Sequence, residues 1–520
     1  MSRRAIARSS APFVFLLTGA CQHAQHASAS PRGPLAAPNL DVTITVRPVR
    51  DGGPQVVAAS VREEIRGTLN QGMRPLSVRI GIVYTSRSGI ADRVDSMTMR
   101  DAAGAVPIRI DNDPEDKSGY TYYRHWRAER TVQPPVVVTY RIRPVARITG
   151  GPQYDFDAHD GGLSSHGSQL FVLPESLGTG RIRLKWDLSE LDPGSIAVGS
   201  YGEGDVQLMA RPDSLVDSFF LVGRLGCYEP TTANTGFHAY WLGRPAYDPQ
   251  KEMAWLFQAY ENMRSFYHST DASPYRVFVR AVGRGGGTAS GRSFMGSVPA
   301  GIEDSAVQAP RVTIAHEIGH HFVGDLTGGQ PEDAPWYEEG LNTHYTRLLL
   351  LRAGLLSLSE YATEINTYAR SYYSNPYRNL TSDSIRVIGY SAGFGAAGAQ
   401  NLAYSRGSLF WGDIDGRIRA ASRGRHKLDD VIGPLLLARD NGQPLTQEVL
   451  LDALVKELGA SVREQFDAVI TRGGTLVPAS NAFGPCLERR EAKYSVQGRE
   501  YDGYQWVRVP SVPDERCREW

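Results

Sequence analysis

The stretch TIAHEIGHHF, residues 313–322, places an imidazole, a carboxylate and a second imidazole within five positions. Pro310 before this stretch can begin a helix, and Gly324 after it can end one. His316 and His320 then lie on one helical face, about 6 Å apart along the axis. Both imidazoles can therefore reach one zinc ion. Glu317 falls beside that face, where its carboxylate can take the proton from a catalytic water.

A zinc ion that takes part in catalysis usually has three protein ligands and one open position, so the pattern needs a third ligand. The segment PWYEEGLNTHY, residues 335–345, follows a turn-rich stretch and leaves eighteen residues between His320 and Glu339. Pro335 suits the first turn of a second helix, on which Glu339 completes a His₂Glu set. Glu338 is the alternative ligand, although it points about 100° away around the helix. The sequence therefore predicts one zinc ion per chain.

H-E-x-x-H, eighteen residues and W-x-x-E-G together resemble the gluzincin zinc metallopeptidases. HEIGHHFVGDLT is similar to the zinc-binding helix of the large zinc aminopeptidase family, whereas WYEEGLNTHYTRLLLLRAGLLSLSEY and NLAYSRGSLFWGDIDGRIRAAS are more similar to the glycyl aminopeptidase family. The resemblance implies His316, His320 and Glu339 as zinc ligands. It also implies Glu317 as the general base and Tyr404, in AYSRGS, as the donor that stabilises the oxyanion. A neutral phenol can fill that last role.

The sequence departs from these families in two places. Their members carry G-x-M-E-N or G-G-x-E-H before the zinc helix, and the glutamate of this motif binds the free amine of the substrate. At that place the chain has GRGGGTASGRSFMGSVPAG, residues 283–301, which lacks a carboxylate, so Glu303 and Asp304 are the possible substitutes. The glycyl aminopeptidase family often ends in a PDZ domain, for which too few residues remain. We predict a zinc-dependent, aminopeptidase-like peptidase; the alternatives are an endopeptidase or a secreted binding protein with this scaffold and little activity.

The rest of the sequence predicts an α+β multidomain fold. Short β-branched or alternating runs, separated by Gly, Pro, Asp and Asn, fill the N-terminal part and indicate an all-β, sandwich-like region. His159 and His166 lie there in a Gly- and Ser-rich segment that we expect to be solvated. The predicted parts are a signal peptide and linker (1–30), the sandwich-like region (38–222), a thermolysin-like catalytic domain (223–350), a helical domain (351–475) and a disulfide-tied tail (476–520).

The N-terminal segment MSRRAIARSSAPFVFLLTGAC has two arginines, a short apolar core and small residues, which is typical of a secretory signal. LTGAC resembles a bacterial lipoprotein box, which would make Cys21 a lipid anchor. The alternative is ordinary cleavage near Ala27–Ser28–Ala29. Both outcomes predict export, either to the bacterial periplasm or as a membrane-anchored lipoprotein.

The remaining cysteines are consistent with an oxidising compartment. Cys486 and Cys517 both lie in the last segment and are expected to pair, which leaves Cys227 free or buried. The net charge of zero gives no argument for nucleic acid as the main partner, and none is expected. The expected partner is a peptide or protein substrate, and the sequence does not specify an oligomeric state.

Overall fold

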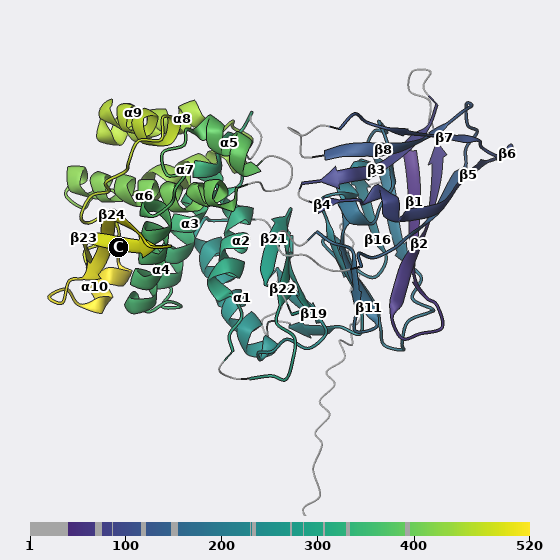
Figure 1. Ribbon diagram of the computed structural model, residues 1–520, viewed down its shortest axis with the longest axis horizontal. Helices are drawn as coiled ribbons and strands as arrows, with labels where there is room; N and C mark the ends of the chain where they lie inside the picture. Colours follow the sequence, from purple (N-terminus) through teal and green to yellow (C-terminus); the bar gives the residue numbers. More distant parts are fainter. Residues whose placement is uncertain are drawn as a thin grey trace, which may run out of the picture.

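The β-rich and the helical parts of the chain lie at opposite ends of the molecule (Figure 1). Strands β19 (Phe237–Leu242), β21 (Gly286–Ser290) and β22 (Ser293–Val298) lie between them. The predicted α+β multidomain class is therefore confirmed. The computed structural model describes residues 40–67, 75–85, 87–115, 121–146, 154–228, 230, 236–270, 273–283, 285–304, 307–328, 333–390 and 396–520.

Two sheets face each other in the N-terminal region. Burial alternates along β1 (Leu40–Arg50), so Val42, Ile44 and Val46 are fully buried while their neighbours are not. The inner faces of both sheets contribute to one hydrophobic cluster, as in a β-sandwich. The first sheet has the order β16-β13-β1-β2-β9-β5-β6 and the second β12-β3-β8-β7, with β4 on β3. Their other bounds are β2 Val56–Gly67, β3 Ser77–Tyr84, β4 Arg87–Ser88, β5 Val94–Asp101, β6 Gly104–Ala105, β7 Ile108–Asn112, β8 Thr121–Ala128, β9 Val136–Ile142, β12 Leu173–Pro174, β13 Gly180–Trp186 and β16 Val206–Ala210.

A third sheet connects this region to the middle of the molecule. Its order is β10-β11-β17-β14-β15, and β17 is buried along its whole length. Phe219 and Leu221 of β17 pack in one hydrophobic cluster with Tyr240 of β19. His166, at the end of β11, is fully buried, so the expectation of a solvated histidine was wrong. The bounds are β10 Asp157–His159, β11 Gly162–His166, β14 Ile196–Gly199, β15 Gly202–Glu203 and β17 Phe219–Gly223.

A five-stranded sheet forms the middle layer, in the order β18-β19-β20-β22-β21. Strands β19, β20 (Tyr275–Ala281) and β22 run parallel, and β21 is an antiparallel edge strand. The helix α1 (Pro249–Phe266) packs against this sheet, with Pro249 in its first turn and Asp248 as N-cap. The short strand β18 (Gly226–Tyr228) pairs with β19. The free edge of β21 is the side of the sheet that the zinc-motif helix approaches.

Helices account for most of the remaining chain, as predicted for the segment after Pro310. The zinc-motif helix α2 (Arg311–Val323) ends at Gly324, which adopts a positive φ of 58°. The next helix, α3, begins at Pro335 and is buried over most of its length. The bounds are α3 Pro335–Arg352, α4 Leu358–Tyr373, α5 Ser382–Tyr390, α6 Ala397–Ser422, α7 Asp429–Asp440, α8 Gln447–Leu458 and α9 Ser461–Phe466, followed by a π-helical turn over Asp467–Thr471.

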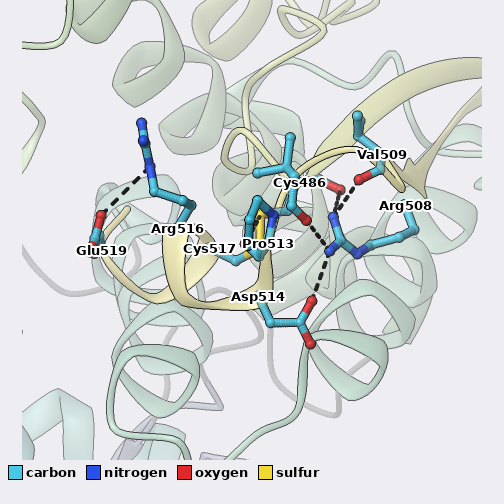
Figure 2. Close-up of a disulfide and its surroundings, with 9 residues drawn as sticks. Cys486, Arg508, Val509, Pro513, Asp514, Arg516, Cys517 and Glu519 are labelled. Carbon is cyan, nitrogen blue, oxygen red and sulfur yellow. Dashed lines mark hydrogen bonds and ion pairs between the residues drawn. A yellow bond between two sulfur atoms is a disulfide. The ribbon is translucent and has the colours of Figure 1, made fainter.

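The last segment is a hairpin of β23 (Leu487–Val496) and β24 (Arg499–Arg508) followed by α10 (Asp514–Arg518). Cys486 and Cys517 form a disulfide with their Cα atoms 5.6 Å apart, and Figure 2 shows it behind Pro513. The hairpin packs on α4, because Asn366 bonds both the N–H and the carbonyl of Trp506.

Three expectations concern other cysteines and the N-terminus. Cys227 is disulfide-bonded and therefore not free. The signal segment, Cys21 and the alternative cleavage site lie outside the described residues. Among the residues that the structure describes, no helix has both the length and the apolar character needed to cross a membrane.

Candidate metal centre

Two arginines hold the zinc-motif helix α2 at its ends. At the beginning, Arg311 donates two hydrogen bonds of 2.7 Å to Glu252 of α1, whose carboxylate is almost completely buried. At the end, Arg439 of α7 donates to the carbonyls of Phe322, at 2.9 Å, and Val323. These carbonyls have no partner within the helix, and a cation near a helix C-terminus is favourable. The axis of α2 is thus fixed by residues distant in sequence.

Glycines in all three motifs let the helices approach closely. A Cβ atom on Gly340 of α3 would lie 2.6 Å from Gly407 Cα of α6, and a Cβ on Gly407 would meet Gly340 equally closely. A Cβ on Gly319 of α2 would lie 2.0 Å from Asn342 Oδ1. The glycines of HEIGH, WYEEG and SRG therefore bring α2, α3 and α6 into contact around Glu339.

His316, His320 and Glu339 come together as the sequence predicts. One ligand atom from each lies within 4.8 Å of the others. Glu339 Oε2 is 3.0 Å from His316 Nε2 and 3.3 Å from His320 Nε2. Tetrahedral bonds of about 2.0–2.1 Å to zinc place neighbouring ligand atoms about 3.3 Å apart. The three residues therefore fit a zinc ion, and the donor set matches the His₂Glu set of catalytic zinc sites.

The electrostatics of the three ligands favour a bound cation. Burial lowers the pKa of His316 to about 4. The hydrogen bond to Glu339 acts in the opposite direction but does not outweigh burial. Burial also lowers the pKa of His320, but the charge of Glu339 and a hydrogen bond to it outweigh burial and raise the pKa to about 10. Burial raises the pKa of Glu339, but the two imidazoles reverse this and hold it far below its usual range. A metal ion held here would take the place of the His320 proton, because a histidine ligand must be neutral.

The side chain of Glu317 extends from α2 to the edge strand β21 of the middle sheet. Its Oε2 atom accepts a hydrogen bond of 3.0 Å from the Ala289 N–H of β21, and its own carbonyl accepts one of 3.2 Å from the Tyr275 hydroxyl. Burial is the main cause that raises the Glu317 pKa, to about 7. A carboxylate with a pKa near neutrality is suited to receive and return a proton.

Tyr404 reaches the same centre from α6. Its hydroxyl donates a hydrogen bond of 2.7 Å to Glu339 Oε1, and its ring lies 5.6 Å from the ring of His316. The predicted phenol is therefore next to the zinc ligands, bonded to the glutamate oxygen that does not face the imidazoles.

Sequence reasoning missed the residues that orient His316. Asn342 Nδ2 donates to the His316 carbonyl at 2.7 Å, and Thr343 Oγ1 lies 3.5 Å from His316 Nδ1. Asn342 follows Glu339 by three positions and Thr343 follows it by four, so the helical period of α3 could have identified them. Such supporting contacts fix the orientation of a ligand imidazole.

Other polar residues near the motifs, and the two possible substitutes for the amine-binding glutamate, occupy different places. His344 is buried away from the centre, and neither ring nitrogen has a hydrogen-bond partner among the described residues. Asp325 hydrogen-bonds to Glu338 instead of to a ligand imidazole. Glu303 and Asp304 lie on an exposed loop after β22. The edge strand β21 itself carries no carboxylate.

Comparison with solved structures assigns the fold. An aminopeptidase N family protein from Idiomarina loihiensis superposes with a TM-score of 0.69 and 14% identity, covering 86% of this chain and 79% of that one. The chain shares its fold with an aminopeptidase N family protein. An M1 zinc metallopeptidase from Deinococcus radiodurans has a TM-score of 0.49 at 17% identity, covering 85% of this chain and 95% of that one. Yeast LTA4 hydrolase has a TM-score of 0.48 at 13% identity, covering 86% and 71%.

No protein-family model matches the sequence, and no curated protein matches it either. The structural neighbours are thus zinc metallopeptidases of the M1, aminopeptidase N-like kind, which are gluzincins. At these identities the likeness concerns the fold. Any statement about chemistry must rest on the residues of this chain.

Proposed function

We propose that this protein is a zinc-dependent peptidase that hydrolyses peptide bonds in an aminopeptidase-like manner. The observation that carries the proposal is the convergence of His316, His320 and Glu339 at distances that suit one zinc ion. Glu317 and Tyr404 stand beside these ligands, as a hydrolytic centre requires. A secreted binding protein with little activity has no need for Glu317 and Tyr404, so that alternative is disfavoured.

The chain supplies the proton transfers and the oxyanion donor. A zinc ion held by the three ligands would supply Lewis-acid activation of a water molecule and of the scissile carbonyl. Glu317 accepts the proton of the attacking water and then donates it to the leaving amine. The Ala289 N–H fixes the carboxylate in place for both transfers. Tyr404 turns its hydroxyl from Glu339 to the oxygen that becomes negative in the transition state.

Strand β21 supports a peptide as the substrate. It is an edge strand whose other side pairs with β22, and the N–H of Ala289 points from the free edge towards the catalytic carboxylate. An extended peptide can add to such an edge through main-chain hydrogen bonds. This strand has no side chain at Gly286 and Gly287 and only a methyl group at Ala289, so a substrate backbone can approach closely.

Replacing Glu317 by Gln tests the proposal. We expect kcat on a peptide library to fall about 10²–10⁴-fold, the contribution of a general base, while one zinc ion per chain remains bound. The amide is isosteric, so the ligand geometry should not change. Wild-type kcat in this variant would exclude Glu317 as the base, and a wild-type protein that contains zinc but cleaves no peptide would exclude the peptidase function.

The finer family assignment and the location are further proposals. WYEEGLNTHY and AYSRGS support a relationship to the glycyl aminopeptidases within the gluzincins. The N-terminal sequence supports export as a periplasmic protein or as a lipoprotein anchored at Cys21. Mass spectrometry of the mature N-terminus after cell fractionation tests both outcomes, because a diacylglyceryl group on Cys21 and a free terminus near residue 30 differ in mass.

A further inference from the structure

The turn between β21 and β22 is held by the N-terminal region. These two strands lie between that region and the helices (Figure 1). Ala289, near the end of β21, donates its N–H to Glu317, the proposed general base, at 3.0 Å. The turn begins one residue later, at Ser290, and ends at Ser293, the first residue of β22. A contact that fixes this turn therefore also limits where the Ala289 N–H can lie.

A chain of three serine residues connects the turn to the third sheet. The Ser293 hydroxyl donates to the Ser290 carbonyl at 2.9 Å, and Ser293 Oγ lies 2.6 Å from the Oγ atom of Ser200, directly after β14. A hydroxyl has one proton, which Ser293 gives to Ser290, so Ser200 is the donor to Ser293. The Ser200 oxygen accepts in turn from the Phe219 N–H of β17, at 2.8 Å. These hydrogen bonds therefore run in one direction, from the backbone of β17 to the backbone of β21.

Arg276 of β20 joins the same two segments through their backbones. Its guanidinium donates to the Ser200 carbonyl at 3.1 Å, and its own N–H donates to the Arg292 carbonyl, inside the turn, at 3.0 Å. Ser293 is completely buried, so bulk water cannot replace a hydrogen bond lost there. The turn is thus held against the third sheet by hydrogen bonds that are costly to break.

His166 holds the turn from β11. Its Nε2 atom lies 3.5 Å from Ser290 Oγ, and its Nδ1 atom accepts a hydrogen bond of 3.4 Å from the Ser168 N–H. The imidazole is fully buried, and burial lowers its pKa to about 3, so it is neutral. A neutral imidazole has one N–H, and with Nδ1 as an acceptor this N–H is on Nε2. His166 therefore directs its proton at the Ser290 side chain.

We infer that Ser200 and His166 are positioning residues of the proposed peptidase reaction, because they hold the turn that places a main-chain donor on Glu317. The inference rests on the proposed function and adds residues of the N-terminal region to it. Both residues act through the backbone of β21. A displaced strand moves the donor away from the Glu317 carboxylate, and a misplacement of about 1 Å can cost up to about 10²-fold in rate.

Replacing Ser200 by Ala is the main test, because it removes the donor to Ser293 and adds no atoms. We expect kcat on a peptide library to fall about 10-fold, with KM changed less than about 3-fold and the zinc content unchanged. Ser218→Ala is the matched control. Ser218 is also completely buried, and it donates to the Leu215 carbonyl at 2.6 Å, so the control loses a similar hydrogen bond outside the turn. The control should keep the wild-type kcat.

A double-mutant cycle separates positioning of Glu317 from general weakening of the protein. In a Glu317→Gln background the general base is already absent, so Ser200→Ala should lower the residual kcat by less than about 2-fold. A residue that only supports the fold would instead lower kcat by the same factor in both backgrounds.

The link through His166 is tested by conservative pairs. Ser290→Thr keeps an Oγ atom for His166 and should keep kcat within about 2-fold, whereas Ser290→Ala should lower it several-fold. His166→Phe removes the N–H but retains a ring against Phe219, whose centroid is 4.9 Å away, and should match Ser290→Ala.

Hydrogen exchange gives a readout that does not depend on turnover. In the zinc-loaded full chain, Ser200→Ala should speed amide exchange within residues 286–293, because the turn opens more often without its tie to the third sheet. Exchange in α2 should not change. Ser218→Ala should leave the exchange of residues 286–293 at the wild-type rate.

Three results would overturn the inference. A wild-type kcat in Ser200→Ala would show that the serine chain does not serve the reaction. An equal loss of kcat in Ser218→Ala, or a full 10-fold loss that persists beside Glu317→Gln, would assign the effect to general weakening. Unchanged exchange of residues 286–293 in Ser200→Ala would refute the inference even in an active enzyme. If the zinc-loaded wild type cleaves no peptide, the proposed function itself fails.

Discussion

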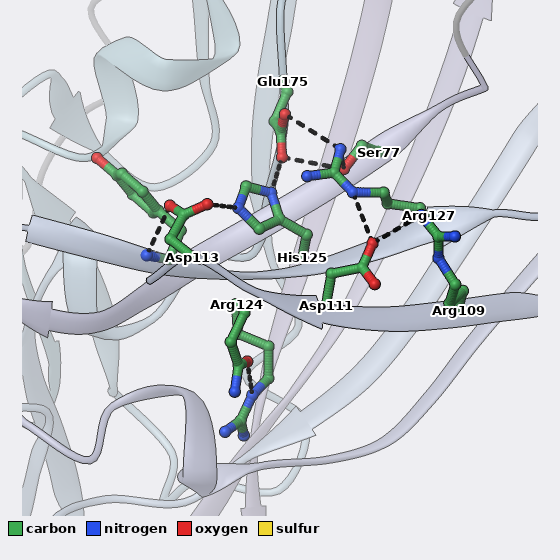
Figure 3. A network of polar contacts seen from close by, with 10 residues as sticks. Ser77, Arg109, Asp111, Asp113, Arg124, His125, Arg127 and Glu175 are labelled. Carbon is green, nitrogen blue, oxygen red and sulfur yellow. Dashed lines mark hydrogen bonds and ion pairs between the residues drawn. The ribbon is translucent and has the colours of Figure 1, made fainter. Parts of the chain in front are cut away.

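One polar network of the N-terminal β-region and the metal centre treat charge in opposite ways. In this network, charged side chains pair with each other: His125 lies between Asp113 and Glu175, and Arg127 bonds Asp111 (Figure 3). At the metal centre, three acidic residues, Glu317, Glu338 and Glu339, have no Lys or Arg ion-pair partner among the described residues. Groups that pair internally stabilise a fold, whereas unbalanced buried groups need a ligand from outside.

This difference shows where function resides in the molecule. An uncompensated carboxylate in a buried site is costly for folding, so it indicates a cation that the chain alone does not supply. Glu317 of α2 and Glu338 and Glu339 of α3 are such groups, and α3 is buried over most of its length. Changes at the metal centre should therefore alter chemistry, and changes in the packing should alter stability.

Loss of a metal ligand should have the largest effect. Replacing Glu339 by Ala removes one of three ligands and the acceptor for Tyr404. We expect zinc content to fall from one per chain to near zero and kcat/KM to fall about 10⁴-fold or more. Elemental analysis after gel filtration gives the first value and peptide assays the second. Arg127→Ala in the β-region is the control and should retain its zinc. Loss of zinc from Arg127→Ala, or full zinc content in Glu339→Ala, would contradict the assignment of zinc binding to the metal centre alone.

Removal of the Tyr404 hydroxyl should have the next largest effect. Tyr404→Phe keeps the ring beside His316 but deletes the proposed oxyanion donor, so kcat should fall about 10²–10³-fold with zinc retained. Stopped-flow or steady-state assays measure this loss. A fall in zinc content with little change in kcat per bound zinc would instead assign Tyr404 to the support of Glu339.

Closing the gap between α3 and α6 should reduce stability. Gly340→Ala places a methyl group 2.6 Å from Gly407 Cα, and such overpacking costs about 1–3 kcal/mol, here towards the upper end because both contacts are backbone. Gly178→Ala, at an exposed position outside any helix or strand, is the control, since nothing lies within 4 Å of a Cβ there. Urea unfolding should show a lower midpoint for the first variant and an equal or higher one for the second. Equal stability of the two variants would mean that α3 and α6 can accommodate the added methyl group.

Acidification should weaken the β-region through His166. Burial lowers the His166 pKa to about 3, while the unfolded chain takes up this proton near pH 6.5. The stability from the neutral imidazole is thus fully present above pH 6.5 and is lost as the pH falls towards 3, by about 2 kcal/mol at pH 5. His166→Asn cannot take up the proton, so its unfolding free energy should depend less on pH over this window. Parallel slopes for both proteins would show that His166 does not make this contribution.

The sequence predicted the centre better than its surroundings. The bounds of α2 and α3 follow from Pro310, Gly324 and Pro335, and the ligand trio follows from two spacings, because a helix converts sequence distance directly into spatial distance. The strands of the β-region were recognisable from the alternation of buried and exposed residues, as in β1.

Contacts between distant elements were not predictable. Arg439 at the end of α2, the contact of Gly340 with Gly407 and the approach of His166 to Ser290 of β21 each join segments far apart in the chain. No local period encodes such contacts. His166 was misjudged for the same reason, since neighbouring Gly and Ser residues indicated solvent, whereas β17 and Tyr154 cover it.

Diffraction at the zinc absorption edge from crystals of the purified protein tests the central claim most directly. The account predicts one anomalous peak per chain, within bonding distance of the Nε2 atoms of His316 and His320 and of a carboxylate oxygen of Glu339. A metal-free centre in protein purified without chelators, or a single peak held by other residues, would contradict it.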